Sequence, residues 1–139
     1  MLKKFNILIT NTKRSIQYLK LLDKEKLFPN HVIYLDDNKR NSISSNLKKI
    51  INLKKYNLSI FKTDNINNIE VVKCLTKSKI KNIIYSGYPA KIVKNKNLLK
   101  DKNLIHSHPG LLPSYKGSAT IYYSILNENK IYCTTFVIN

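Results

Sequence analysis

The sequence predicts one α/β domain, residues 1–139, built on an open, doubly wound and mainly parallel sheet between two helical layers, α/β/α. Two observations support this fold class. Short runs of β-branched and aromatic residues alternate with segments whose apolar residues recur every three or four positions. The chain has 139 residues, of which 42% are hydrophobic, and this suffices for one compact core. Strands that alternate with helices of about 10–15 residues favour a parallel sheet with right-handed crossovers.

Six segments are predicted as strands because they are short runs rich in Ile, Val, Leu, Tyr and Phe. In chain order they are residues 5–10, 31–35, 58–61, 82–86, 103–107 and 131–137. Gly87 and Pro89 end the fourth of them, since both residue types interrupt regular structure.

The connections between the strands are predicted as helices. The first has four apolar residues spaced for one helix face, namely Ile16, Leu19, Leu22 and Leu27. Asn11 or Thr12 is the candidate N-cap of this helix. The further predicted helices lie near residues 43–51, 66–75, 91–100 and 120–126.

Ligands of such a sheet bind at the carboxyl ends of its strands. Thr10, Ser86 and Ser107 end three of the predicted strands, so the segments after them are predicted at the functional edge. The first of these turns, residues 10–14, reads Thr-Asn-Thr-Lys-Arg. It has neither the GxGxxG of a dinucleotide site nor the glycines of a P-loop. We therefore expect no nicotinamide or ATP cofactor bound in the usual way.

The formal net charge is +17, from 25 Lys and Arg residues against 8 Asp and Glu. Only Arg14 and Arg40 are arginines, and the lysines are spread along the whole chain. This pattern favours a solvated basic surface that attracts anions. The alternative is a basic nucleic-acid-binding domain, which predicts a clustered basic face and an affinity that falls steeply with salt.

No apolar run approaches the roughly 20 residues that span a bilayer. The apolar part of the first ten residues is too short for a signal peptide and is better explained as a strand. We therefore expect a cytoplasmic protein that does not bind membranes. Cys74 and Cys133 show neither a CxxC pattern nor metal-ligand spacing, so we expect two buried, reduced thiols and no metal site.

Residues 105–117 differ in composition from the rest of the chain. Six residues that either exchange protons or shape the backbone fall there: His106, His108, Pro109, Gly110, Pro113 and Gly117. The prolines prevent a helix, and the glycines permit tight turns or a close backbone approach. A histidine fixed just after a buried strand can exchange a proton near neutral pH. The alternative is that both histidines only satisfy hydrogen bonds at a strand end.

Residues 108–113, His-Pro-Gly-Leu-Leu-Pro, resemble the His-Pro-Ser-Leu-Leu-Pro signature of the 10-formyltetrahydrofolate-dependent formyltransferases. Upstream, residues 83–88 are similar to the strand, glycine and aromatic residue of that family's folate segment. Downstream, residues 121–126 and 134–137 resemble the helix and the strand that follow the signature. The resemblance covers residues 80–139 and implies the Rossmann-like fold of these formyltransferases.

The resemblance implies a reaction in which a formyl group passes from 10-formyltetrahydrofolate to a primary amine. The family uses an Asn-x-His pair and a later Asp, and its histidine corresponds to His108. His106 stands where the family has asparagine, and an imidazole that donates one hydrogen bond keeps that role possible. We therefore take His106 and His108 as catalytic candidates. The folate-binding candidates are Tyr85, Ser86, Gly87 and Tyr88.

The amine substrate is expected near the first turn and along the loop after His108. The substrate-binding candidates are Asn11, Lys13, Pro109, Gly110, Leu112, Tyr115, Lys116 and Gly117. Lys13 and Lys116 are candidates for contacts with a substrate phosphate, and the alternative for each is an ordinary surface lysine. A small amine that carries a phosphate or a nucleotide would suit the basic charge.

Three acceptors are compatible with the resemblance. The first turn lacks the glycines that glycinamide ribonucleotide enzymes use, and the loop at 114–118 lacks the arginines of methionyl-tRNA enzymes. Residues 117–124 are similar to amino-sugar and nucleotide-sugar formyltransferases, so we rank that acceptor first. The family's Asp lies a few residues beyond Thr-Phe-Val, so we expect a chain truncated before it at Asn139. A catalytically incomplete ligand-binding remnant is therefore a further alternative, and the oligomeric state is left open.

Overall fold

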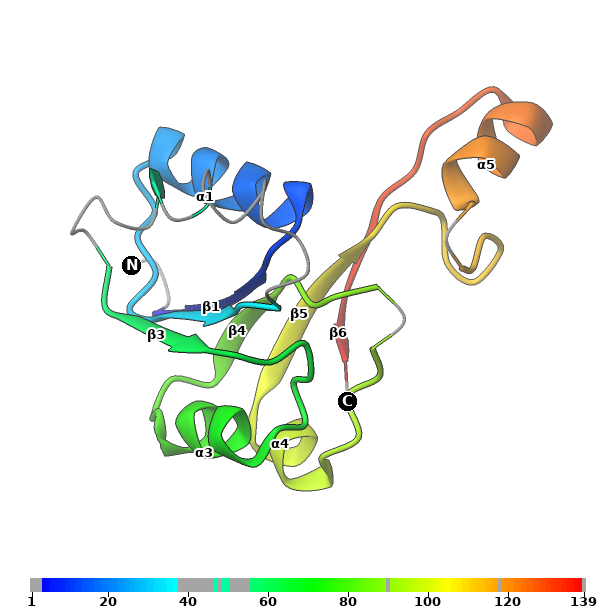
Figure 1. Ribbon diagram of the computed structural model, residues 1–139. Helices are drawn as coiled ribbons and strands as arrows, with labels where there is room; N and C mark the ends of the chain where they lie inside the picture. Colours follow the sequence, from blue (N-terminus) through cyan, green and yellow to red (C-terminus); the bar gives the residue numbers. More distant parts are fainter. Residues whose placement is uncertain are drawn as a thin grey trace.

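The computed structural model describes residues 4–37, 47, 49–50, 56–89, 91–117 and 119–138 (Figure 1). Its strands form one sheet with the order β3-β2-β1-β4-β5-β6. Their bounds are β1 (Asn6–Thr10), β2 (Val32–Leu35), β3 (Leu58–Phe61), β4 (Asn82–Tyr85), β5 (Asn103–His108) and β6 (Thr134–Ile138). Each strand overlaps a predicted one, and the doubly wound α/β class is confirmed.

The sheet is parallel from β3 to β5 and antiparallel only between β5 and β6. In the antiparallel pair, Leu104 lies opposite Ile138 and His108 lies opposite Thr134. This pairing extends β5 through His108, whereas the sequence predicted a strand that ends at Ser107. His108 is thus held by the sheet itself, because β6 supplies its backbone partner.

Among the described residues, the helices with defined bounds are α1 (Lys13–Lys24), α3 (Ile69–Lys77), α4 (Lys96–Asp101) and α5 (Thr120–Glu128). In Figure 1, α1 covers one face of the sheet, and α3 and α4 cover the other, which confirms the three layers. Thr12 caps α1, since its side chain accepts a hydrogen bond from the Ser15 amide. The helix predicted near residues 43–51 lies outside the described residues except for 47, 49 and 50.

The helix predicted around residues 91–100 begins only at Lys96, so its first half was wrong. Asn95 caps α4 by accepting a hydrogen bond from the Leu98 amide at 2.9 Å. The preceding amides of Lys94 and Asn95 donate instead to the side chain of Asn67, at 2.7 and 3.2 Å. These contacts with a distant loop satisfy the backbone there without a helical turn.

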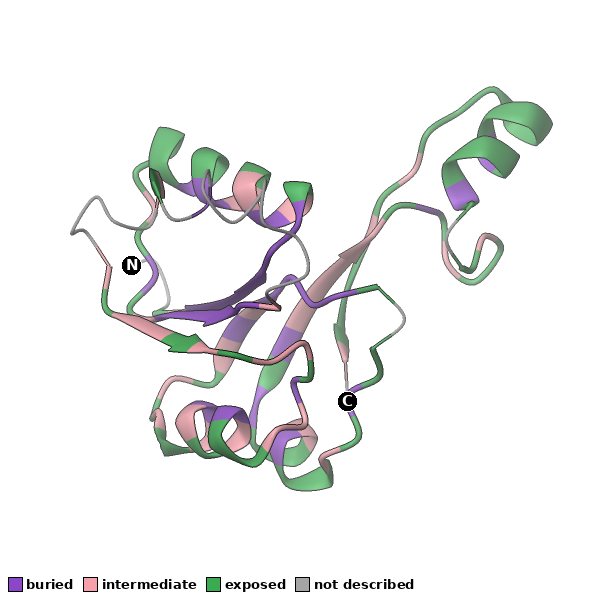
Figure 2. Cartoon of the chain, viewed as in Figure 1, coloured by how far each residue is buried: buried purple, intermediate pink, exposed green. Residues whose placement is uncertain are grey.

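Two apolar clusters fill the space on either side of the sheet. On β1, Ile7 and Ile9 face α1, while Leu8 faces α3 and α4, and all three are fully buried. Such two-sided burial is typical of the central strands of a parallel sheet. Figure 2 shows this burial in β1 and β2 and shows α5 largely exposed, away from the sheet. The clusters therefore fix β1 and β4, from which the functional edge is built.

Two further expectations concern single residues and the membrane. Cys74 is half-buried and Cys133 is exposed, so the prediction of two buried thiols was wrong, although both thiols are free. Cys133 lies between α5 and β6, in a segment that packs against little of the described core. Within the described ranges, no helix is long and apolar enough to cross a membrane.

Lys102 is the one described lysine that is buried, and its removal is expected to destabilise the fold. Its Nζ donates to the Ser78 carbonyl at 2.6 Å and lies 2.7 Å from an Asp101 carboxylate oxygen. The hydrogen bond from Lys102 to Asp101, together with the positive charge of Lys102, lowers the pKa of Asp101. Lys102→Ala should reduce the free energy of unfolding by about 1–3 kcal/mol in urea denaturation, because the partly buried Ser78 carbonyl loses its donor.

Lys100→Ala is the matched control, since Lys100 lies two residues earlier and is exposed. It should change the free energy of unfolding by less than about 0.5 kcal/mol. Equal losses in the two variants would contradict a structural role for the Lys102 ammonium.

Candidate active site

The carboxyl ends of β4 and β5 border a pocket of ≈ 690 Å³. Seven of the predicted site residues line it: Tyr85, Gly87, Tyr88, His106, His108, Pro109 and Gly117. The structure thus brings both histidines of β5 to the segment after β4, although about twenty residues of sequence separate them. The predicted location at the carboxyl edge of the sheet holds for this group.

His106 is oriented by the neighbouring strand. Its Nδ1 lies 3.1 Å from the Tyr85 carbonyl oxygen. A carbonyl only accepts hydrogen bonds, so Nδ1 carries the proton and Nε2 of the neutral ring has a free lone pair. The ring also lies 5.8 Å from the Tyr85 ring and packs at 5.7 Å, edge to face, on Phe136. Toward a ligand in the pocket, neutral His106 can therefore accept a proton at Nε2 but not donate one, because its Nδ1 proton is bonded to Tyr85.

Burial lowers the pKa of His106 below its ordinary value of 6.5. The hydrogen bond to the Tyr85 carbonyl opposes this effect, and the positive charges of Arg14 and of protonated His108 add to it. The imidazole of His106 is thus uncharged at neutral pH. This state differs from the hydrogen-bond donor that the sequence comparison with Asn-x-His suggested.

His108 is the last residue of β5, and its Nε2 donates to the Tyr115 carbonyl at 3.0 Å. Its Nδ1 therefore accepts a proton when the ring is neutral and donates one when it is charged. The bond also closes the loop of residues 109–115 onto the strand. Both histidines line one pocket. His106 bonds a backbone carbonyl through Nδ1, whereas His108 bonds one through Nε2.

The loop after His108 is fixed to β6 and α5. The Thr134 hydroxyl donates to the Gly110 carbonyl at 2.6 Å and accepts from the Leu112 amide at 3.1 Å. The Thr120 hydroxyl donates to the Pro109 carbonyl. A Cβ at Gly110 would lie 2.9 Å from the Thr120 Cβ, so this approach requires glycine.

The segment after β4 is anchored by buried hydroxyls. The Thr10 hydroxyl donates to the Ser86 carbonyl at 2.8 Å, and the hydroxyls of Ser86 and Ser15 lie 2.9 Å apart. The Tyr88 hydroxyl donates to the Leu35 carbonyl at 3.0 Å and accepts from the Asn11 amide at the same distance. These bonds hold the predicted folate segment against β1 and β2.

Gly87 is a place where a side chain has no room. A Cβ there would lie 2.0 Å from the Tyr85 hydroxyl oxygen and 2.2 Å from its Cζ. Tyr85 is only 5% exposed, and the pocket that it lines is the space into which its ring can yield. Gly87→Ala is expected to displace the Tyr85 ring into the pocket, since overpacking costs about 1–3 kcal/mol. If the pocket holds the folate donor that the resemblance implies, the variant should bind a folate analogue at least about tenfold more weakly, a loss of about 1.4 kcal/mol.

Calorimetry with a folate analogue measures this effect, and far-ultraviolet circular dichroism checks that the fold is retained. Gly117→Ala is the comparison, because a Cβ there meets no atom within 4 Å, although its φ of +91° adds backbone strain. Unchanged analogue affinity in a folded Gly87→Ala variant would show that the Tyr85 ring does not border the donor site.

Arg14 is a site residue that sequence reasoning missed. Its Nε donates to the Ser86 hydroxyl at 3.3 Å and its Nη2 to the Gly87 carbonyl at 2.5 Å. The guanidinium lines the pocket of the two histidines. The available signal was that Arg14 is one of two arginines and lies in the first βα turn.

Known proteins resemble this chain in structure, whereas searches with its sequence found no match. No family model matches the sequence, and no curated protein matches it. A sugar N-formyltransferase from a Shewanella species superposes with a TM-score of 0.61 at 17% identity, over 98% of this chain and 51% of that one. A phosphoribosylglycinamide formyltransferase from Anaplasma phagocytophilum gives 0.68 at 17% identity, over 99% and 65%. A 4-N formyltransferase from Francisella tularensis gives 0.62 at 23% identity, over 98% and 50%.

The chain has the formyltransferase fold. It spans between half and about two thirds of the length of these three proteins. The fold that the signature at residues 108–113 implied is thereby confirmed. At these identities the likeness concerns the fold.

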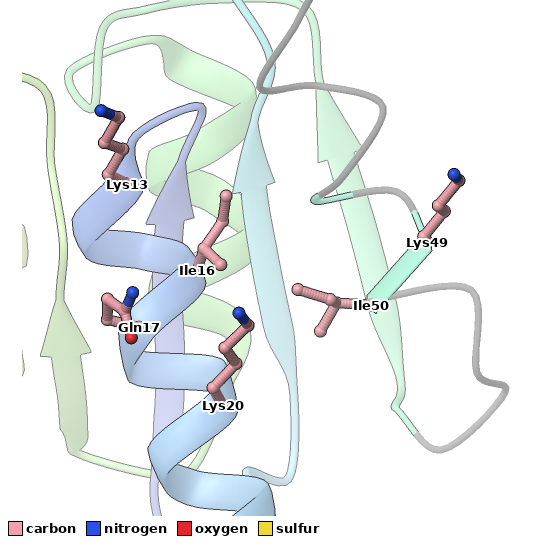
Figure 3. A pocket seen from close by; sticks show the side chains of 6 residues that line it. All are labelled: Lys13, Ile16, Gln17, Lys20, Lys49 and Ile50. Atoms are coloured by element: carbon pink, nitrogen blue, oxygen red, sulfur yellow. The ribbon is translucent and has the colours of Figure 1, made fainter.

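The other residues that the sequence predicted for the site do not line the histidine pocket. Lys13 lines a different pocket of ≈ 490 Å³ between α1 and residues 49–50, with Lys20 and Ile50 (Figure 3). Five more are absent from the lining of the histidine pocket, although the structure describes them: Asn11, Ser86, Gly110, Leu112 and Tyr115. Each of these five residues belongs to the loop after His108 or to the segment after β4, or is hydrogen-bonded to one of them, and both carry lining residues.

Lys116 is exposed and does not line the histidine pocket. Tyr115 turns its hydroxyl away to Glu128, at 2.6 Å, and contributes only its carbonyl to His108. Neither lysine chosen for a substrate phosphate therefore lines this pocket. Arg14 and Lys91 are the cations that do, and Lys91 also pairs with Asp64 at 2.8 Å.

Proposed function

We propose that residues 1–139 form one formyltransferase-like domain that moves a formyl group from 10-formyltetrahydrofolate to a primary amine. One observation carries this proposal: His106 and His108 line a single pocket beside Tyr85, Gly87 and Tyr88. The formyltransferase fold supports the same reaction, because it places this pocket at the carboxyl edge of the sheet. The proposal names a reaction class and not a single acceptor.

The pocket is suited to a folate donor in size and lining. Its volume of ≈ 690 Å³ falls within the range of about 300–1,000 Å³ for small-molecule sites. Tyr85 and Tyr88 provide aromatic walls, and Gly87 leaves the backbone open where a Cβ would collide with Tyr85. When bound, the donor supplies an activated formyl carbon on nitrogen. The residues of the chain hold that carbon beside the histidines.

The two histidines divide the proton transfers between them. In the overall reaction the amine nitrogen bonds to the formyl carbon, the bond from that carbon to the donor nitrogen breaks, and one amine proton passes to the donor nitrogen. Neutral His106 accepts the amine proton at Nε2, because its Nδ1 is committed to the Tyr85 carbonyl. His108, when protonated, donates from Nδ1 to the formyl oxygen or to the leaving nitrogen.

We infer that the acceptor is an amino sugar linked to a phosphate or a nucleotide. Among the described residues that line the pocket are Arg14 and Lys91 and no carboxylate, so the pocket favours an anionic ligand. Two of the superposed proteins are described as a sugar N-formyltransferase and a 4-N formyltransferase. The first βα turn has no glycine, which argues against glycinamide ribonucleotide.

This absence of a carboxylate among the described lining residues also supports a second candidate, a domain that binds folate or a related ligand without turnover. In the resemblance, an Asp orients the catalytic histidine, and no lining residue of the described pocket takes that part. This candidate predicts affinity for a folate analogue together with no formyl transfer to any acceptor.

An acceptor panel distinguishes these proposals. The protein, alone and extended by any sequence encoded in frame after Asn139, is mixed with 10-formyltetrahydrofolate and one amine at a time. The amines are a 4-amino-sugar nucleotide, glycinamide ribonucleotide and methionyl-tRNA. Mass spectrometry should detect formylation of the 4-amino-sugar nucleotide in preference to the others. Analogue binding without any product would establish the binding-only domain, and absence of both would refute the folate proposal.

A further inference from the structure

Arg14 links the first turn of α1 to the segment after β4. Its Nε and Nη2 donate to the Ser86 hydroxyl and the Gly87 carbonyl, at 3.3 and 2.5 Å. The Ser86 hydroxyl also lies 2.9 Å from that of Ser15, one residue further along α1. The side chain of Arg14 is half-buried, so these donors are partly shielded from water.

The segment that Arg14 holds also orients His106. Ser86 follows Tyr85 directly, and the Tyr85 carbonyl accepts the hydrogen bond from Nδ1 of His106 at 3.1 Å. A continuous series of contacts therefore runs from the guanidinium through residues 85–87 to the imidazole. A shift of the Ser86 backbone would move the carbonyl that sets the tautomer and tilt of the His106 ring.

We propose that Arg14 is a positioning residue of this site: it clamps residues 86–87 to α1 so that the Tyr85 carbonyl keeps Nε2 of His106 free to accept a proton. This inference rests on the proposed function, because it assigns His106 the role of proton acceptor. It concerns a residue that makes no contact with the reacting atoms and acts through Ser86, Gly87 and Tyr85.

The charge of Arg14 acts in the same direction as its hydrogen bonds. The groups that face His106 are Arg14 from α1, Tyr85 from β4, His108 from β5 and the uncharged Phe136 from β6, with Lys91 in the same pocket. Burial is the largest cause of the lowered pKa of His106, and the Arg14 charge adds to it. Without this charge, His106 should protonate at a higher pH and lose its free lone pair sooner on acidification.

Substitution of Arg14 by lysine or by glutamine separates the contribution of its hydrogen bonds from that of its charge. Arg14→Lys keeps the positive charge, but a single ammonium lacks the planar fork that reaches both Ser86 and Gly87. Arg14→Gln removes the charge and most of the donors. Lys20→Gln is the matched control, since Lys20 lies on the exposed side of α1 and outside the histidine pocket.

The experiment is a nitrogen-15 and proton NMR titration of His106, assigned with His106→Asn, in the wild-type protein and the three variants. The wild type and Lys20→Gln should show the tautomer protonated at Nδ1. Arg14→Gln should raise the titration midpoint of His106, and Arg14→Lys should leave the midpoint low but mix the two tautomers. With a reactive acceptor, both Arg14 variants should lower kcat about tenfold, as loss of alignment does. Arg14→Lys should also leave KM for the amine nearly unchanged, because it keeps the charge that favours an anionic acceptor.

These readouts keep the inference separate from the proposed function. The NMR signals report on the coupling of Arg14 to His106 even where no formyl transfer is detected, and that outcome would refute the function alone. If Arg14→Gln does not fold, the tautomer mixture in Arg14→Lys still decides the question. An unchanged tautomer in Arg14→Lys, or an unchanged midpoint in a folded Arg14→Gln, would overturn the inference.

Discussion

Replacing His108 with alanine is expected to lower the rate of formyl transfer by about 10²–10⁴-fold, the usual contribution of a positioned acid or base. The reason is that His108 ends β5 inside the pocket and its Nδ1 is the group that donates a proton once the ring is charged. The variant also loses the bond to the Tyr115 carbonyl, so part of the effect comes from a looser loop. Steady-state rates with saturating donor and amine measure the change.

His31→Ala is the matched control because His31 is the third histidine and lies elsewhere. It is half-buried beside β2 and bonds to the Ser59 hydroxyl at 2.9 Å, outside the histidine pocket. Its rate of transfer should stay within about twofold of the wild type, as for a substitution away from the site. Equal losses in the two variants, or full activity in His108→Ala, would exclude His108 as a catalytic residue.

The second large effect is expected at His106 and depends on pH. Burial disfavours the imidazolium, so the pKa of His106 lies below 6.5 and the neutral, proton-accepting form persists at pH 7. The rate should therefore fall as the pH drops through this lowered pKa. His106→Asn should reduce the rate at pH 7 by about 10²-fold and remove this acidic limb of the profile.

The pH profile of kcat in the wild type and in His106→Asn tests this role. His106→Asn also restores the Asn-x-His order that the resemblance contains. A rise in rate would therefore mean that position 106 supplies a hydrogen-bond donor and that His106 weakens the site. If the fall in rate at acidic pH persisted unchanged in His106→Asn, it would be due to the titration of another group.

The strands and the loop were predictable because their signals are local. Residues 58–61 are predicted and observed as a strand with the same bounds, since a β-rich run there stands between polar segments. The dense group of His, Pro and Gly at the end of β5 and just after it likewise predicted residues that the structure brings to one pocket. The start of α4 was not predictable in this way, because Asn67, from a distant loop, binds the amides of Lys94 and Asn95.

The choice of Lys13 over Arg14 shows where local reasoning ends. Consecutive residues on a helix point about 100° apart, so only one of the two can face the histidine pocket. Arg14 faces it and reaches residues 72 and 73 positions later in the chain, whereas Lys13 faces the other pocket. Only the packing of α1 beside β4 decides between them, and that packing is a tertiary property.

The pocket is proposed to transfer a formyl group to an amine nitrogen. The most direct test follows a carbon-13 label by NMR, from labelled 10-formyltetrahydrofolate, with a 4-amino-sugar nucleotide as the acceptor. The label should appear in an amide of the acceptor with the wild-type protein and not with a His106→Ala, His108→Ala double variant. A label that stays on the donor, or that is released only as formate, would contradict the claim.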